Sequence, residues 1–208
     1  MEDILDLYQA APDPAYPVVC FDEGAKQLLG ERRQAYPARP GQPARYDYSY
    51  FRAGICNLFM CFDPLSGQRD VLCFRQRTKR EWAQWVKHLV DDLYPEATRI
   101  RLVLDNLNTH TVAALYLHFA PDEAHRLASK LELHYTPIHG SWLNMAEIEL
   151  SVLARQCLDR RIDSLQFVQD EIAVWQRQRN AVAATIDWRF TTADARIRLK
   201  HLYPNFQP

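Results

Sequence analysis

Apolar runs bounded by turn-forming residues predict five β-strands in this chain. Runs of about four to eight residues that are rich in branched or aromatic side chains are typical of strands. The predicted strands are 18–21, 48–62, 70–74, 100–104 and 131–135. The second and third are separated by Asp63-Pro64-Leu65-Ser66-Gly67, a strong turn signal, so these two strands are predicted to form a hairpin.

Apolar residues at helical spacing predict helices around these strands. Thr78 is suited to cap a helix that reaches Leu93 and turns two tryptophans toward the core. Further helices are predicted from Ser141 or Asn144 to about Asp159, and over 112–119, 121–129, 164–179 and 193–201. A hairpin followed by alternating helices and strands predicts an α/β fold, in which a mixed five-stranded sheet carries helices on both faces.

Two stretches lack this regular pattern. Residues 1–16 combine a short amphipathic segment with Pro12 and Pro14, which predicts a brief helix and a linker. Residues 24–47 are basic and proline-rich, and they are predicted to form an ordered excursion or a hairpin loop at the functional edge of the sheet. Residues 17–208 are otherwise predicted to form one domain, which is long enough for a hydrophobic core.

Charge and cysteine content narrow the possible functions. The 208 residues carry a net charge of −1, which argues against strong non-specific binding to nucleic acid, so DNA contacts would have to come from local patches. Two basic patches are available, and they consist of Arg75, Arg77, Lys79 and Arg80, and of Arg155, Arg160, Arg161, Arg177 and Arg179. Four of the five cysteines lie in strand-like apolar segments, which predicts buried thiols in a reducing compartment. With no signal peptide or membrane-length apolar run, the protein is expected to be cytoplasmic and to have no membrane partner.

Two acidic residues follow buried strands at corresponding positions. Asp22 comes after 18–21, and Asp105 comes directly after 100–104. In open α/β sheets ligands bind beyond the carboxyl ends of the strands, where two parallel neighbours would bring these carboxylates side by side. Adjacent carboxylates repel each other unless they share a cation, and Mg²⁺ and Mn²⁺ are hard ions that prefer oxygen ligands. The alternative is that each Asp simply begins a turn.

A third carboxylate is available on the predicted helix that follows Asn144. On a helical wheel, one apolar stripe is formed by Ala146, Leu150, Leu153 and Cys157. Glu147 falls among the residues that widen this stripe, whereas Glu149 falls at its other edge. A charge on an inward arc is costly unless it has a partner. Glu147 is therefore the preferred metal ligand, and Glu149 is expected to be solvated or paired in a salt bridge.

With these acids identified, the sequence resembles a DDE transposase, with its best match in the bacterial insertion-sequence branch of the mariner-like superfamily. The matching strings are Cys20-Phe21-Asp22-Glu23, Leu104-Asp105-Asn106-Leu107-Asn108-Thr109-His110 and His139-Gly140-Ser141-Trp142-Leu143-Asn144-Met145-Ala146-Glu147-Ile148-Glu149-Leu150. The resemblance covers nearly the whole chain and implies a ribonuclease-H-like catalytic domain whose metal-binding catalytic acids are Asp22, Asp105 and Glu147. Two features depart from the family pattern: the spacer between Asp105 and Glu147 is longer, and Ile138 stands where relatives often carry a basic residue.

The resemblance also implies a chemistry and a set of partners. Two Mg²⁺ or Mn²⁺ ions per active site, about 3.5–4 Å apart, would act on the scissile phosphate during strand cleavage and strand transfer. The partners would be double-stranded DNA, as transposon ends and target, and a second copy of the chain in a homodimer associated with the bacterial nucleoid. Full-length relatives have an N-terminal helix-turn-helix region. We therefore expect a separate helix-turn-helix protein, or an N-terminal domain missing from this sequence, to read the transposon ends.

Polar and basic residues along the same strings are candidates for DNA contacts. They are Asn106, Asn108, His110, His139, Trp142, Asn144, Arg155, Arg160 and Arg161. A structural role in the turn is an equal alternative for His110, capping of a helix is an equal alternative for Asn144, and packing is the better explanation of Trp142.

Two other functions remain open at this point. A ribonuclease-H-like nuclease would cleave DNA without a strand-transfer step. An inactive remnant would serve only as a DNA-binding or dimerisation module. The presence of all three acids argues against a remnant, and the expected loss of the DNA-reading half argues for it.

Overall fold

The computed structural model describes residues 1–33, 36–45 and 48–203, and within them the predicted five-stranded sheet is confirmed. The strands are β1 Val18–Glu31, β2 Tyr50–Asp63, β3 Gln68–Phe74, β4 Ile100–Leu104 and β5 Leu131–Tyr135. They lie in the order β3-β2-β1-β4-β5. β1 is parallel to β4 and β4 to β5, whereas β1 pairs with β2 and β2 with β3 in antiparallel register. The sheet is therefore mixed, and its second and third strands form the predicted hairpin.

β1 is much longer than the sequence predicts. The predicted strand ends at Phe21, but β1 has 14 residues and continues to Glu31. It pairs with β2 along this extension, from Asp22 beside Met60 to Glu31 beside Tyr50. Of the two alternatives predicted for 24–47, an ordered excursion agrees with its first part, which is strand and not loop. Polar residues interrupt the apolar run here, and the strand is maintained by its pairing with β2, which a local pattern cannot reveal.

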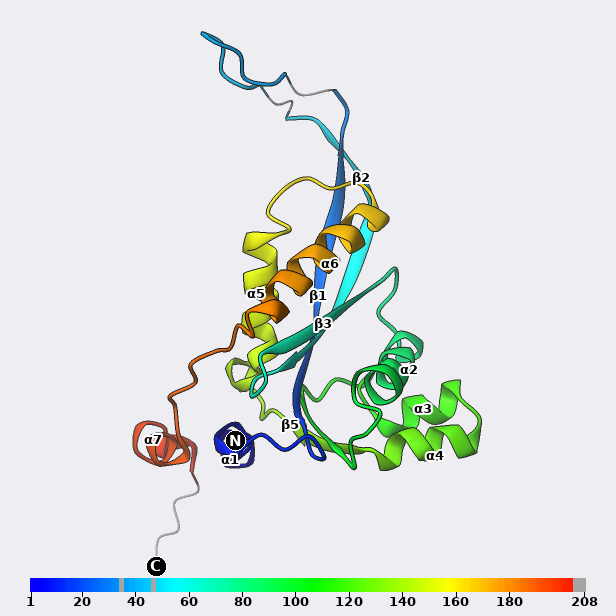
Figure 1. Cartoon of the computed structure of the whole chain (residues 1–208), viewed down its shortest axis with the longest axis vertical. Helices are drawn as coiled ribbons and strands as arrows, with labels where there is room; N and C mark the ends of the chain where they lie inside the picture. Colours follow the sequence, from blue (N-terminus) through cyan, green and yellow to red (C-terminus); the bar gives the residue numbers. More distant parts are fainter. Residues whose placement is uncertain (34–35, 46–47, 204–208) are drawn as a thin grey trace, which may run out of the picture.

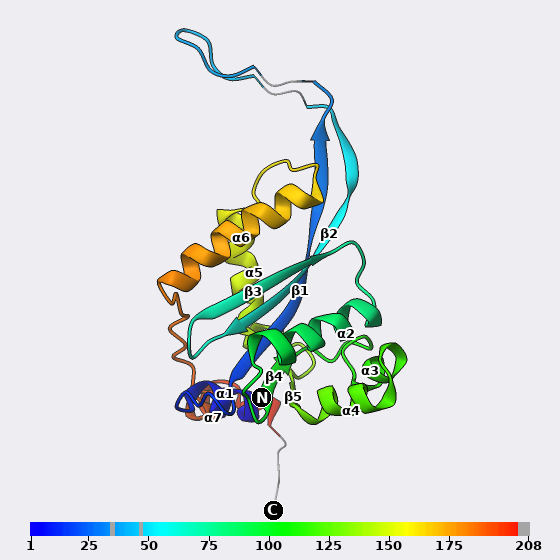
Figure 2. The ribbon, with the colours of Figure 1, turned by 45° about the vertical axis from the view of Figure 1, so that its right-hand side comes forward.

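The extended ends of β1 and β2 form an arm that projects from the body of the protein (Figure 1; Figure 2). We define the arm as the described residues of 26–55. The sequence of this segment contains six basic residues and two acidic ones. Tyr36 and Tyr48 are 73% and 94% exposed, so the arm packs few of its side chains against the body. Residues 34–35 and 46–47 of the predicted excursion lie outside the described residues.

Helices cover both faces of the sheet, as predicted (Figure 2). They are α1 Glu2–Gln9, α2 Lys79–His88 with a π-helical turn Leu89–Leu93, α3 Val112–His118, α4 Pro121–Ser129, a 3₁₀ turn Ser141–Leu143, α5 Met145–Gln156, α6 Leu165–Ala181, α7 Thr192–Arg198 and a 3₁₀ turn Lys200–Leu202. Thr78 caps α2, as predicted, by accepting a hydrogen bond from the backbone N–H of Arg80. Of the two predicted starts for α5, the structure has Asn144 as the capping residue.

Alternate residues of β1 face two separate hydrophobic cores. Val19 and Phe21 pack with α2, α3 and α4, whereas Val18 and Cys20 pack on the side of α5 and α6. Side chains along a strand alternate between faces. The residues that follow Phe21 should continue this alternation, so Asp22 is directed toward the α5 side and Glu23 toward the α2 side.

The short helix predicted within residues 1–16 is α1, and it contributes to the body of the protein. Its residues Ile4 and Leu5 are buried in the core that contains Val18. α7 packs beside α1 (Figure 1), where Arg196 Nε lies 2.8 Å from Glu2 Oε1. The first and last helices of the described chain are therefore side by side. Across the described ranges, no helix combines the length and the apolar character needed to cross a membrane.

Candidate active site

Two of the predicted acids lie at the carboxyl edge of neighbouring parallel strands. The pairing of β1 with β4 places Cys20 beside Val103. Continuing this register by two residues brings Asp22 level with Asp105, which follows the last residue of β4. The prediction that these acids come from parallel neighbouring strands is confirmed. Asp22 differs from the prediction in lying within a continuous strand, which gives its backbone a rigid support.

Asn144 connects the start of α5 to β1. Its Oδ1 atom accepts a hydrogen bond from the backbone N–H of Ala146 at 3.2 Å, and its Nδ2 atom donates to the carbonyl oxygen of Phe21 at 2.7 Å. Asn144 is buried, and Glu147 lies in the first turn of the helix that it caps. Because Phe21 precedes Asp22, this contact holds the helix that carries Glu147 against the strand that carries Asp22.

The charges of Asp105 and Glu147 act on Asp22. Burial and, to a smaller extent, the negative charges of Asp105 and Glu147 raise the pKa of Asp22 to about 6. A hydrogen bond from the backbone N–H of Glu23, at 2.8 Å, acts in the opposite direction. Three carboxylates from distant parts of the sequence therefore lie close enough for the charges of two to disfavour ionisation of the third.

These carboxylates match a divalent metal ion in their chemistry. Carboxylate oxygens are the hard donors that Mg²⁺ and Mn²⁺ prefer, and a cation would relieve the repulsion among them. Among the described residues, no three His, Cys, Asp or Glu side chains already surround a point where an ion could sit. Glu147 is exposed, so its side chain can change rotamer without displacing the core. The assignment of these three residues as metal ligands stays a prediction.

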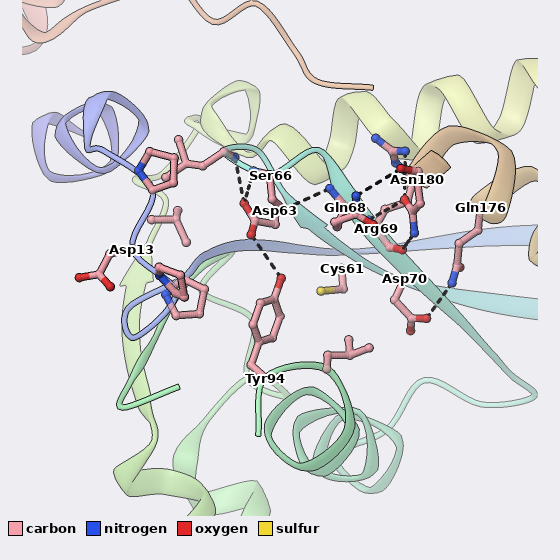
Figure 3. A pocket seen from close by; sticks show the side chains of 16 residues that line it. Asp13, Cys61, Asp63, Ser66, Gln68, Arg69, Asp70, Tyr94, Gln176 and Asn180 are labelled. Carbon is pink, nitrogen blue, oxygen red and sulfur yellow. Dashed lines mark hydrogen bonds between the residues drawn. The ribbon is translucent and has the colours of Figure 1, made fainter. Parts of the chain in front are cut away.

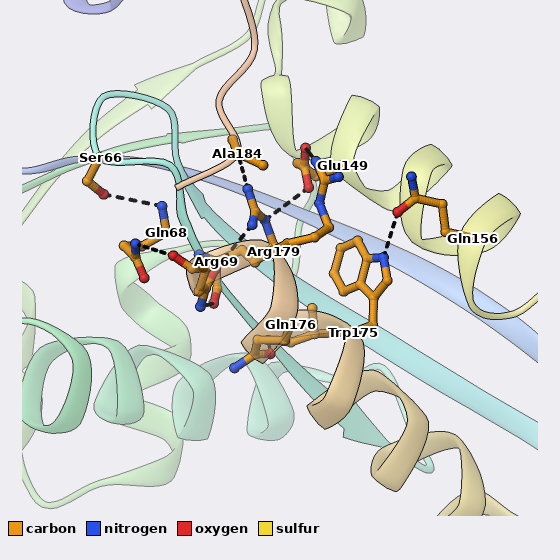
Figure 4. Close-up of polar contacts among 11 residues, drawn as sticks. Ser66, Gln68, Arg69, Glu149, Gln156, Trp175, Gln176, Arg179 and Ala184 are labelled. Carbon is orange, nitrogen blue, oxygen red and sulfur yellow. Dashed lines mark hydrogen bonds and ion pairs between the residues drawn. The ribbon is translucent and has the colours of Figure 1, made fainter. Parts of the chain in front are cut away.

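The burial of the two glutamates in α5 is the reverse of what the helical wheel predicts. Glu147 is exposed, whereas Glu149 is 1% exposed. The Oε2 atom of Glu149 lies 3.0 Å from Arg69 Nε, and its Oε1 atom lies 2.9 Å from Arg179 Nη2 (Figure 4). Of the two alternatives expected for Glu149, the salt bridge is confirmed and the solvated position is wrong; the predicted inward position of Glu147 is also wrong. The wheel fails because the arginines that neutralise Glu149 come from β3 and α6, outside the helix.

A chain of three polar side chains, two of them buried, joins Asp105 to β1. His110 Nδ1 lies 2.7 Å from Asp105 Oδ1, and His110 Nε2 lies 3.0 Å from Glu23 Oε1. The side chains of His110 and Glu23 are 1% and 3% exposed. Burial lowers the pKa of His110, but its hydrogen bonds with Asp105 and Glu23 outweigh that effect and raise the pKa to about 9. No local signal in the sequence marks Glu23 as functional, and strand alternation directs it to the opposite face from Asp22.

The residues predicted to contact DNA fall into exposed and buried groups. The exposed residues are Asn106, Asn108, His139, Trp142, Arg155, Arg160 and Arg161. His110 and Asn144 are buried, and their polar atoms are occupied by the contacts described above, which supports the structural alternatives considered for both. Trp142 stacks on Trp188 with 6.2 Å between ring centroids, as expected for packing. Arg179 is not available to a DNA patch, because its guanidinium binds Glu149.

A separate cavity of about 480 Å³ lies near the beginning of β1 (Figure 3). It is lined by the linker after α1, the turn between β2 and β3, Tyr94 and the end of α6. Asp63 in its wall uses one carboxylate oxygen to accept hydrogen bonds from the backbone N–H groups of Leu65 and Ser66. Val18, which lines the cavity, precedes Asp22 by about 13 Å of extended strand. The cavity is therefore distinct from the edge that carries the three acids.

Solved structures of Mos1 mariner complexes share the fold of this chain. The chain resembles the crystal structure of the Mos1 mariner paired end complex with Mn, with a TM-score of 0.56, 18% identity and coverage of 88% of this chain and 55% of that chain. A pre-cleavage Mos1 transpososome gives a TM-score of 0.54 and 18% identity, with coverage of 88% and 58%. The Mos1 paired end complex with Mg gives a TM-score of 0.53 and 20% identity, with coverage of 85% and 52%. The chain thus spans little more than half the length of these proteins.

These likenesses confirm the ribonuclease-H-like α/β fold. A search among curated proteins gives no significant match. The family model described as DDE superfamily endonuclease matches residues 17–169, which include β1 to β5, α5 and all three predicted acids. The match covers well over half of the sequence. The chain therefore belongs to the DDE superfamily of endonucleases.

Proposed function

We propose that the protein is the catalytic domain of a transposase, which cleaves DNA and joins the cleaved ends to target DNA, with Asp22, Asp105 and Glu147 as its catalytic acids. The observation that carries this proposal is the placement of the acids: the register of β1 and β4 brings Asp22 level with Asp105, and the buried Asn144 ties the helix of Glu147 to β1. The raised pKa of Asp22, which arises from burial and to a smaller extent from the charges of its acidic neighbours, supports it. Groups with shifted pKa values in one place are typical of active sites. The Mos1 structures with this fold are complexes with transposon ends, which supports DNA as the substrate.

Asp22 and Asp105 would hold the metal ions from the rigid edge of the sheet, and Glu147 would hold one ion from α5 and orient the attacking water. When bound, two Mg²⁺ or Mn²⁺ ions supply Lewis-acid activation of the attacking oxygen and stabilisation of the leaving oxygen. The buried hydrogen bond from Asn144 to β1 keeps α5 in register with Asp22. These residues would therefore hold the carboxylates and the bound ions in position before the substrate binds.

The proposed reaction has two steps. In the first, water adds to a backbone phosphorus and a P–O bond breaks, which leaves a 3′-hydroxyl and a 5′-phosphate. In the second, that 3′-hydroxyl attacks a phosphorus of the target strand and displaces the oxygen of the adjoining nucleotide. Neither step requires a covalent bond between the enzyme and DNA.

Basic side chains lead away from the acids along α5. Arg155 lies eight positions after Glu147, which is about 12 Å along the helix. Arg161 follows α5 and packs over the ring of Tyr50 at the base of the arm, 5.5 Å from the ring centroid. The arm continues this path with the six basic residues of its segment. Double-stranded DNA would follow this surface, and its binding should weaken steeply as salt is raised.

The expected partners are part of the same proposal. A transposon has two ends, and a homodimer would provide one active site for each. A separate helix-turn-helix protein, or an N-terminal domain of a longer chain, would read the sequence of the ends. The Mos1 chains that share this fold extend well beyond the region that this chain matches.

The first experiment measures nicking of supercoiled plasmid with Mn²⁺ by the wild-type protein and by Asp105→Asn, purified in the same way. We expect nicking by the wild type and none by the variant, because the Asn side chain removes the charge that holds the ion. Equal nicking by both proteins would assign the activity to another site or to a contaminant.

A second experiment separates a transposase from a nuclease. A labelled DNA end with a free 3′-hydroxyl is incubated with plasmid, the protein and Mn²⁺. Covalent joining of label to plasmid supports the transposase. Cleaved ends with a 5′-phosphate and a 3′-hydroxyl, but no joined product, would support a ribonuclease-H-like nuclease instead.

A further inference from the structure

Asp105 has little support of its own. It follows the last residue of β4, and three exposed residues come directly after it. Its side chain is 34% exposed. A carboxylate in this position can rotate freely unless a neighbour holds it. The neighbour is His110, whose Nδ1 atom lies 2.7 Å from Asp105 Oδ1.

His110 itself is held firmly. Its ring packs edge-on against Phe21, with 5.1 Å between centroids, and lies parallel to Trp82 at 6.1 Å. Its carbonyl oxygen accepts a hydrogen bond from the hydroxyl of Tyr135 at 3.2 Å, and its backbone N–H donates to Leu107. The imidazole is 1% exposed, so it cannot turn without disturbing the core.

Glu23 holds this imidazole from the side opposite to Asp105. Its Oε1 atom lies 3.0 Å from His110 Nε2, on the side of the ring opposite to Asp105. With a carboxylate at each ring nitrogen, the imidazole is held from both sides, and its Nδ1 atom faces Asp105 Oδ1. The second oxygen of Glu23 lies 3.4 Å from Arg77 Nε, and the Arg77 side chain is 53% exposed. A buried glutamate is costly to the fold without such partners, so its presence here needs a reason.

We propose that His110 and Glu23 are positioning residues, which hold one oxygen of Asp105 so that the other is directed to a metal ion. This inference rests on the proposed function of Asp105 as a metal ligand. It gives the buried pair a role that neither the DNA-contact prediction nor a turn-stabilising role provides. Groups that hydrogen-bond to metal ligands typically change metal affinity by about 10–100-fold when they are removed.

The chain provides a matched control in His134. Its Nδ1 atom lies 2.7 Å from Asp3 Oδ2 and its Nε2 atom lies 3.0 Å from Glu132 Oε1, so it too has a carboxylate on each side. Its side chain is 11% exposed, and its partners come from α1 and β5. His134→Gln therefore removes the same kind of contact without altering Asp105.

The test compares His110→Asn, His110→Gln, Glu23→Gln and His134→Gln with the wild type. The amide of Asn can replace Nδ1 and still donate to Asp105, whereas the amide of Gln reaches the position of Nε2 and leaves Asp105 without its donor. Each protein is titrated with Mn²⁺ by calorimetry without DNA, its melting temperature is measured, and plasmid nicking is followed over a range of Mn²⁺ concentrations.

We expect His110→Gln to weaken Mn²⁺ binding, and to raise the Mn²⁺ concentration for half-maximal nicking, by about 10–100-fold. His110→Asn and Glu23→Gln should show smaller shifts, and His134→Gln should bind Mn²⁺ as the wild type does even if it melts earlier. If His110→Gln fails to fold, Glu23→Gln alone must still shift Mn²⁺ binding.

Unchanged Mn²⁺ binding in folded His110→Gln, or an equal shift in His134→Gln, would overturn the inference. Loss of binding in Asp105→Asn together with normal binding in the His110 and Glu23 variants would remove the positioning role but leave the proposed function intact. A wild-type protein that neither binds Mn²⁺ nor nicks DNA would instead refute the proposed function, and the inference with it.

Discussion

Replacing Glu149 with Gln should destabilise the protein while leaving its chemistry intact. Removing one partner of a buried ion pair costs about 3–5 kcal/mol, because the other charge stays buried without compensation. Here Arg69 is fully buried and Arg179 is 20% exposed, so most of the penalty falls on Arg69. Arg69 still binds Asn180 Oδ1 and the carbonyl of Ala184, and its guanidinium lies 5.3 Å from the ring centroid of Phe62. We therefore expect the free energy of unfolding to fall by an amount near the lower end of this range, about 3 kcal/mol.

For a chain of this size, a loss of about 3 kcal/mol lowers the melting temperature by roughly 6–12 °C. The matched control is Glu147→Gln, two residues away in the same helix. Glu147 is exposed and adds to the negative charge around Asp22, so its replacement should leave the melting temperature unchanged or slightly higher. Differential scanning calorimetry measures both variants, and plasmid nicking is assayed well below the lower melting temperature.

The two variants should give opposite results for stability and for activity. We expect Glu149→Gln to nick plasmid at a rate close to that of the wild type, and Glu147→Gln to be inactive although fully folded. An inactive but folded Glu149→Gln beside an active Glu147→Gln would reverse the assignment of the third acid. A Glu149→Gln protein that melts with the wild type would refute the ion-pair argument.

Three further predictions concern the site and its surroundings. Without metal, Asp22→Asn should raise the free energy of unfolding by at most about 3 kcal/mol at pH 7.5, because a raised pKa means that ionised Asp22 opposes folding. The stability difference between Asp22→Asn and the wild type should shrink as pH falls from about 6 and vanish near pH 3.5. Thermal melting of both proteins at a series of pH values measures it. Asn144→Ala should lower stability by about 2–4 kcal/mol through loss of the helix cap and of the bond to Phe21, whereas Asn144→Ser, which can keep the cap, should lose less in chemical denaturation. Combining Arg155→Ala with Arg160→Ala should reduce the slope of log affinity against log salt by up to about 2, and an unchanged slope in a fluorescence-anisotropy titration would remove these residues from the DNA path.

Much of the fold follows from local patterns in the sequence. The hairpin of β2 and β3, the cap of α2 at Thr78 and the short strand β5 all have signals within a few residues of themselves. The parallel pairing of β1 and β4 could also be predicted, because both are short apolar runs that end near an acid. These features depend on residues that are close together in the sequence and on the spacing of apolar residues along it. A single sequence shows both directly.

The features that the sequence could not provide depend on partners from elsewhere in the chain. β1 continues through polar residues because β2 pairs with it, and the two strands together form the arm. Glu149 is buried because Arg69 and Arg179 reach it from two other elements. The helical wheel selected Glu147 for burial, which is wrong, although the charge of Glu147 does act on Asp22. Glu147 was therefore selected as the third acid because of a predicted inward position that it does not have.

If Asp22, Asp105 and Glu147 together hold a metal ion, as proposed, their carboxylates must be kept in place when no cation is present. Each acid has an anchor on its buried side. Asp22 belongs to a continuous strand, Asp105 is bound to His110, and the helix of Glu147 is tied to β1 by Asn144. Of these anchors, only His110 can carry a positive charge, and it lies beside Asp105 alone, so a bound cation would reduce the remaining negative charge at the edge. A cation that binds there should therefore stabilise the folded protein in proportion to how tightly it binds.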